Sequence, residues 1–128
     1  MARFDKVEPK GGSFRAVLGF AIAAPDVGVI VAVGLDANGK LVKGAGTTGI
    51  VGVICPSNVL SIGNPIDVMT HGEIVDLVAP YVAGKPYFGV DATGVVENVA
   101  PAAGTNKVRI GHTVEAWRLI VRVSANQG

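Results

Sequence analysis

Charged side chains are scarce in this chain: Asp, Glu, Lys and Arg make up 16% of its 128 residues, against about 25% in a typical soluble domain. The 11 Lys and Arg residues form no run and nearly balance the 10 Asp and Glu residues, which leaves a formal net charge of +1. This balance argues against a protein that binds nucleic acid by neutralising phosphates. The scarcity of charge suggests that sister subunits, or a larger assembly, cover much of the surface.

Cysteine is nearly absent too. The single cysteine, Cys55, cannot form an internal disulfide, so the chain has no secreted disulfide framework. We interpret Cys55 as a small buried hydrophobe. No apolar segment is long and unbroken: the most apolar one, Ala16 to Leu35, contains Pro25 and three glycines. We therefore expect no transmembrane helix, and the acidic residues before this segment argue against a secretory signal.

Valine, the commonest residue, and 18 glycines dominate what remains. Such a composition offers little for helices and much for short strands joined by tight turns. We expect roughly ten short strands in an all-β fold, a small β-barrel or sandwich. At this length the chain is one domain, or one domain with an arm.

The sequence reads as two copies of one β-unit. The segment Gly34 to Gly39 (GLDANG) reappears as Gly89 to Gly94 (GVDATG), at an offset of 55 residues (89 − 34). Both segments predict hairpin turns, because their Asp and Gly residues suit the backbone angles of tight turns. In each copy, a loop of small residues then leads to a strand with an internal glycine, Gly52 or Gly111.

Four local expectations can be compared directly with a structure. The continuous apolar run Val29 to Leu35 predicts a strand that is buried on both faces or lies at a subunit contact. We expect a turn at His71-Gly72 and a helical turn in Ala79 to Lys85. Gly111 suggests a β-bulge.

Met1 to Ser13 differs from the rest, since it is polar, mixed in charge and without a period of 2 or 3.6. We interpret these residues as an extended N-terminal arm, and residues 14–128 as the β-domain. One hypothesis is that the arm is a disordered terminus. The other is that it orders on a partner, with Phe4 and Val7 as apolar anchors.

Residues that could carry catalysis are few and scattered. A metal site needs several convergent ligands, and the best set, His71, Glu73 and His112, lies in different strand regions. Asp36 and Asp91 are better explained as turn residues that bond their own backbone than as an acid–base pair or a calcium site. We predict no catalytic residue, no metal and no cofactor.

The chain resembles the small capsid decoration (cement) proteins of tailed phages, roughly from Val27 to Val123 and most of all in its second half. Val82 to Phe88, followed by Asp91 to Val96, is similar to that family's "apolar, small, Gly, Lys, x, aromatic" strand and its turn. Val108 to Ala116 resembles the family's "x-x-Ile-Gly-x-Ala-x-Glu" strand, and Leu119 to Val123 its closing strand. The chain departs from the family pattern in its long charged arm and in Thr113, where the pattern has Ala.

The resemblance implies a β-barrel that binds the outer surface of a phage head as a homotrimer, with the major capsid protein as its partner. It implies no catalysis, no membrane and no direct contact with nucleic acid. It implies that the protein is made in the host cytoplasm and is located in the virion. We expect the arm to provide the capsid contacts, through residues Arg3, Phe4, Lys6, Val7 and Lys10.

Two alternatives remain open on the sequence. A different virion or secreted β-module, such as a tail or carbohydrate-binding domain, would need exposed aromatic residues, for which Tyr81, Tyr87 and Trp117 are the candidates. A small metal-dependent enzyme would need His71 and His112 to converge.

Overall fold

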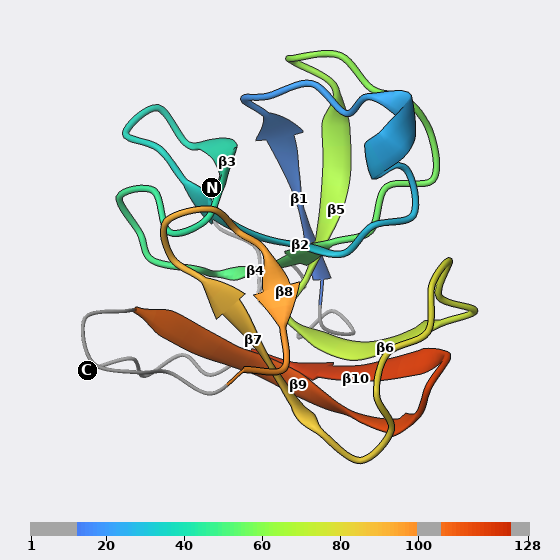
Figure 1. Ribbon diagram of the computed structural model, residues 1–128. Helices are drawn as coiled ribbons and strands as arrows, with labels where there is room; N and C mark the ends of the chain where they lie inside the picture. Colours follow the sequence, from blue (N-terminus) through green and yellow to red (C-terminus); the bar gives the residue numbers. More distant parts are fainter. Residues whose placement is uncertain (1–12, 100–105, 124–128) are drawn as a thin grey trace, which may run out of the picture.

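The computed structural model describes residues 13–99 and 106–123, and it confirms an all-β fold made of a closed barrel and an open sheet (Figure 1). Within these residues the elements are β1 (Ser13–Leu18), the short 3₁₀ helix η2 (Ala24–Asp26), β2 (Val31–Leu35), β3 (Lys40–Lys43), β4 (Gly52–Ile54), β5 (Pro65–Met69), β6 (His71–Val75), β7 (Pro86–Val90), β8 (Val96–Glu97), β9 (Lys107–Glu115) and β10 (Arg118–Arg122).

The strand order repeats between the two halves. β1 to β5 form the closed barrel in the order β1-β3-β2-β4-β5, and β6 to β10 form the sheet in the order β6-β10-β9-β7-β8. Read from β1 in the other direction, the closed barrel has the order β1-β5-β4-β2-β3. If the strands of each half are numbered one to five along the chain, both halves therefore have the spatial order 1-5-4-2-3. The barrel closes because β1 also pairs in parallel with β3, at Val17↔Lys40 and Leu18↔Leu41. The two sequence copies are therefore two units with one topology, closed in one case and open in the other.

The two predicted hairpin turns occupy equivalent places. The first joins β2 to β3, where the Asp36 carboxylate accepts hydrogen bonds from the backbone N–H groups of Asn38 and Lys40, at 2.8 and 3.0 Å. These bonds lower the pKa of Asp36. The second turn joins β7 to β8, and the Gly94 N–H donates to the Val90 carbonyl at 2.7 Å. Asp91 differs from Asp36, since its Oδ1 is buried without a hydrogen bond among the described residues.

Two hydrophobic cores share the strands β2 and β4. One core fills the barrel and includes Leu18, Val33 and Ile54, while the other lies between the barrel and the second sheet and includes Ala32, Val53 and Ile110. Ala32 and Val33 are both fully buried, on opposite faces of β2. The strand is therefore buried on both faces within one chain, and it offers no support for a subunit contact.

Backbone contacts fix one unit against the other. The turn after β7 lies on the first unit, where the Ala32 N–H donates to the Gly94 carbonyl at 2.8 Å and the Ala45 N–H donates to the Asp91 carbonyl at 2.9 Å. Any side chain at Gly94 would enter this contact, because a Cβ there would lie 2.5 Å from the Ala32 carbonyl oxygen. The repeated turn therefore serves as a hairpin and also joins the two units.

The remaining local expectations fare differently. The register between β7 and β9 shifts beside Gly111, which confirms the bulge. The helical turn expected in Ala79 to Lys85 is wrong: the segment is irregular, and the Tyr81 N–H donates to the Ala116 carbonyl at 2.7 Å instead of to a helical neighbour. The turn expected at His71-Gly72 is also wrong, because both residues begin β6, which pairs with β10.

Candidate binding surfaces

The predicted capsid contacts Arg3, Phe4, Lys6, Val7 and Lys10 lie outside the described residues, but the structure shows where the arm joins the body. Ser13, which we had placed at the end of the arm, is the first residue of β1 and pairs with Met69. Next to it, the Val123 N–H donates to the Thr70 carbonyl at 3.0 Å. The segments before Ser13 and after Val123 thus both join the body at the link between β5 and β6.

The three candidate metal ligands lie on one exposed face of the second sheet. Ile120 of β10 is opposite Glu73 of β6 and also opposite His112 of β9, and His71 lies opposite Arg122. These side chains line a shallow depression of about 630 Å³. One strand separates His112 from the other two residues, which places its backbone roughly 10 Å from theirs. Among the described residues no three His, Cys, Asp or Glu side chains are grouped to hold a metal ion.

The charges on this face are partly paired. Arg118 forms ion pairs with Glu73 at 2.9 Å and with Glu115 at 2.8 Å. The Glu73 carboxylate is therefore already paired with the Arg118 guanidinium. Arg122 forms no ion pair with the described residues, so the end of the depression near His71 carries an unpaired positive charge.

Cys55 is exposed, which contradicts its interpretation as a small buried hydrophobe. It follows β4, and its thiol lies 3.6 Å from the Gly28 carbonyl oxygen. Partial burial raises the pKa of the thiol. A raised pKa means less thiolate at neutral pH, so this cysteine is a poor nucleophile.

The candidate aromatic residues do not form a sugar-binding platform. Tyr87 is only 4% exposed and stacks on Tyr81, with ring centroids 4.3 Å apart. The Tyr87 hydroxyl accepts a hydrogen bond from the Val82 N–H at 2.8 Å. Burial, followed by the neighbouring Tyr87, raises the pKa of Tyr81 to about 12. Trp117 is half exposed on the turn between β9 and β10, where the Ala116 carbonyl before it accepts the hydrogen bond from the Tyr81 N–H.

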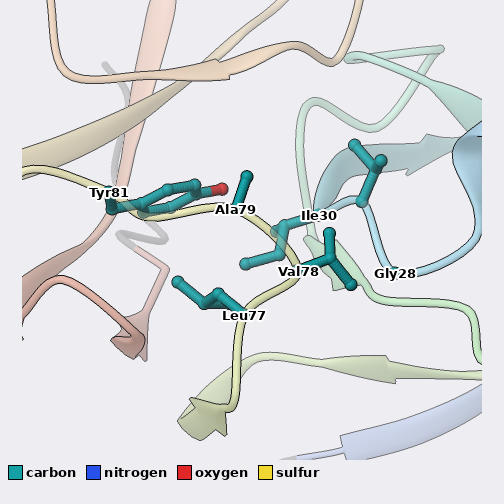
Figure 2. Close-up of a pocket in the computed structure, with 7 residues that line it drawn as sticks. Gly28, Ile30, Leu77, Val78, Ala79 and Tyr81 are labelled. Carbon is teal, nitrogen blue, oxygen red and sulfur yellow. The ribbon is translucent and has the colours of Figure 1, made fainter.

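An apolar hollow lies where the two units meet (Figure 2). Its volume is about 90 Å³, and the residues that line it come from two segments: Gly28, Val29, Ile30, Leu77, Val78, Ala79 and Tyr81. Val29 and Val78 are 40% and 66% exposed, so the rim of the hollow is apolar as well. A Cβ at Gly28 would lie 2.5 Å from a Val78 methyl group, so Gly28 allows the two segments to approach closely.

The sequence reading missed this hollow. Its two segments lie between the first and second strands of their respective units, so the duplication brings equivalent connections together. The repeat makes the two connections equivalent only as wholes, since its offset of 55 residues pairs residues 28–30 with 83–85. No local pattern shows that the two connections face each other.

The comparisons with known proteins support the fold. No family model matches the chain, and a search of curated proteins gives no match. A solved structure from Mycobacterium phage Patience has the same fold, with a TM-score of 0.79 and 22% sequence identity. The match covers 98% of this chain and 97% of the phage chain. The chain therefore shares its fold, over nearly its whole length, with a protein of phage origin.

Proposed function

We propose that this chain is a capsid decoration protein, which binds the outer surface of a tailed-phage head and stabilises it. The observation that carries the proposal is the match to the Mycobacterium phage Patience structure, which extends over nearly all of both chains. A shared domain inside unlike proteins would leave a large part of one chain unmatched. The resemblance of the segments Val82–Phe88 and Val108–Ala116 to the decoration family points the same way.

Stabilisation of this kind needs no catalytic group. A protein that binds only the assembled shell shifts the equilibrium towards that shell by mass action. Many copies on one lattice add their contacts, so each contact can be weak. The double unit suits this role physically, since its two cores and the backbone bonds at Gly94 and Asp91 hold it as one body.

The arm supplies the capsid contact in this proposal. An extended segment can add a strand to an exposed sheet edge, where backbone hydrogen bonds provide affinity and side-chain pockets fix the register. Phe4 and Val7 would enter such pockets, and Arg3, Lys6 and Lys10 would contact polar groups around them. The arm joins the body at Ser13, beside Met69, so the capsid would lie near the link between β5 and β6.

Deletion of Met1 to Gly12 tests the proposal. All the core residues that the structure describes lie after Gly12, so we expect an almost unchanged Tm and a strong loss of binding to phage heads in co-sedimentation. His71→Ala and His112→Ala are the controls, because both side chains are exposed and belong to the polar sheet face. Equal occupancy of heads by the shortened and full-length proteins would contradict the arm as the attachment device.

A further inference from the structure

Each acidic residue in the strands of the second sheet already has a cationic partner. Arg118 binds both Glu73 and Glu115, and Lys107 binds Glu97 at 2.5 Å. Because Arg118 serves two carboxylates, that group has a formal charge of −1 (+1 − 2). Any further cation on these strands therefore lacks a carboxylate of the same sheet.

Two arginines of the sheet are in this position. The side chains of Arg109 in β9 and Arg122 in β10 are exposed and form no ion pair or hydrogen bond with the described residues. They lie on neighbouring strands, since Val121, which precedes Arg122, is opposite Gly111, two residues after Arg109. Both point to the outer face, because their neighbours Ile110 and Val121 belong to the core between the two units.

The two free arginines lie at the end of the sheet where the N-terminal arm begins. Arg122 precedes Val123, whose N–H donates to the Thr70 carbonyl at 3.0 Å. Thr70 in turn follows Met69, which pairs with Ser13 at the root of the arm. The charged group around Arg118 lies towards the opposite end, beside the turn between β9 and β10. The unpaired positive charge is therefore at the end of the sheet that the proposed function turns towards the capsid.

We propose that Arg109 and Arg122 contact a carboxylate-rich region of the major capsid protein, beside the site that receives the arm. This inference rests on the proposed function and adds the chemistry of the partner surface. Guanidinium groups bind carboxylates through two parallel hydrogen bonds, and the carboxylates of the sheet's own strands do not compete for these two arginines. Two isolated arginines are too few for binding to nucleic acid by phosphate neutralisation.

A contact of this kind has a characteristic dependence on salt. Exposed charges across an interface act mainly on the rate of association and on the choice of partner. Their effect falls as ionic strength rises, because the Debye length shrinks from about 10 Å at 0.1 M to about 3 Å at 1 M. Salt should therefore remove the contribution of Arg109 and Arg122 while apolar contacts of the arm persist.

Co-sedimentation with phage heads at two salt concentrations tests the proposal. The test variant is Arg109→Glu/Arg122→Glu, and the matched control is Lys40→Glu/Lys85→Glu, which replaces two exposed lysines outside this face. Both variants have a net charge of −3 (+1 − 4), so they differ only in where the charge lies. Thermal melting checks that both are folded.

We expect the test variant to bind heads at least about ten times more weakly than the control at roughly 0.05 M salt. At roughly 0.5 M salt the two affinities should agree within about twofold, because the charges are then screened. Arg109→Gln/Arg122→Gln should give a smaller loss than the Glu variant, since it removes the attraction without adding repulsion.

Equal binding of the two Glu variants at low salt would overturn the proposal and leave the capsid role standing. A loss that is the same at both salt concentrations would also overturn it, because such a loss is not electrostatic. Unchanged head binding with an altered oligomeric state in light scattering would show that the face receives a second copy instead. A natural chain that binds no heads at either salt concentration would overturn the proposed function and this inference together.

Discussion

Replacement of Gly39 and of Gly94 by Ala should give very different losses of stability, although the two glycines are equivalent in the sequence repeat. Both have a left-handed backbone, with φ of +79° and +77°. A Cβ at Gly39 would have no atom within 4 Å, because that turn projects into solvent. A Cβ at Gly94 would lie 2.5 Å from the Ala32 carbonyl oxygen and 2.7 Å from the Gly44 nitrogen.

The magnitudes follow from these contacts. Gly39→Ala carries only the backbone penalty, which lowers the free energy of unfolding by about 1 kcal/mol. Gly94→Ala carries the same penalty and also an overlap with backbone atoms, for which about 1–3 kcal/mol is typical. The turn can relieve the overlap only by moving from β2, which weakens the hydrogen bond from Ala32 to Gly94 and adds about 1 kcal/mol. We expect Gly94→Ala to lose at least about 3 kcal/mol.

Urea unfolding of the two single variants and the natural chain measures both losses, with thermal melting as a second probe. At roughly 4 °C per kcal/mol for a chain of this size, the Tm should fall a few degrees for Gly39→Ala and more than 10 °C for Gly94→Ala. Equal losses would refute the inference that the second turn joins the two units. The two turns would then act only as local hairpins.

Further variants test other contacts in the structure. Thr113→Val should lower the free energy of unfolding in urea by about 1–3 kcal/mol. The reason is that the buried Thr113 hydroxyl donates to the Val82 carbonyl and accepts from the Lys85 N–H. A loss below about 0.5 kcal/mol, which is typical of surface variants, would contradict this role. Alkylation of Cys55 by iodoacetamide should be slower than that of a cysteine in a short peptide, and its rate should rise at higher pH, since burial raises the pKa of the thiol; a rate profile equal to that of the peptide would argue against this environment.

Local chemistry explains what the sequence could predict. Asn38-Gly39 and Thr93-Gly94 predict turns because of the backbone angles that they favour, and both turns are present. Gly111 marks a bulge, since a Cβ there would overlap the Ile120 carbonyl. The repeat of 55 residues predicted two similar units, and the strand order bears this out.

Contacts between distant segments account for what the sequence could not predict. The parallel pairing of Val17 and Leu18 with β3 closes the barrel, yet no periodic pattern in the sequence specifies it. The apolar run Val29 to Leu35 allowed two interpretations, because a strand buried by its own chain and one buried by a neighbour have the same pattern. Cys55 lies between buried residues on both sides, Ile54 and Pro56, yet its own side chain is exposed, and the apolar run around it gave no sign of this.

The arm lies outside the described residues, so its role remains a prediction from sequence. Its composition suggested apolar anchors at Phe4 and Val7. The depression near His71 and His112 shows the opposite case. The best candidate ligands in the sequence lie there, and the strand register keeps His112 apart from His71 and Glu73.

Cryo-electron microscopy of tailed-phage heads incubated with the full-length protein tests the central proposal most directly. We predict added density on the outer surface of the head, at regularly repeated positions, with three copies of the two-unit fold at each position. Heads incubated with the protein that lacks Met1 to Gly12 should carry little or none of this density. A head surface without added density, for capsids that co-purify with this protein, would contradict a decoration role, and isolated single copies would contradict the trimer.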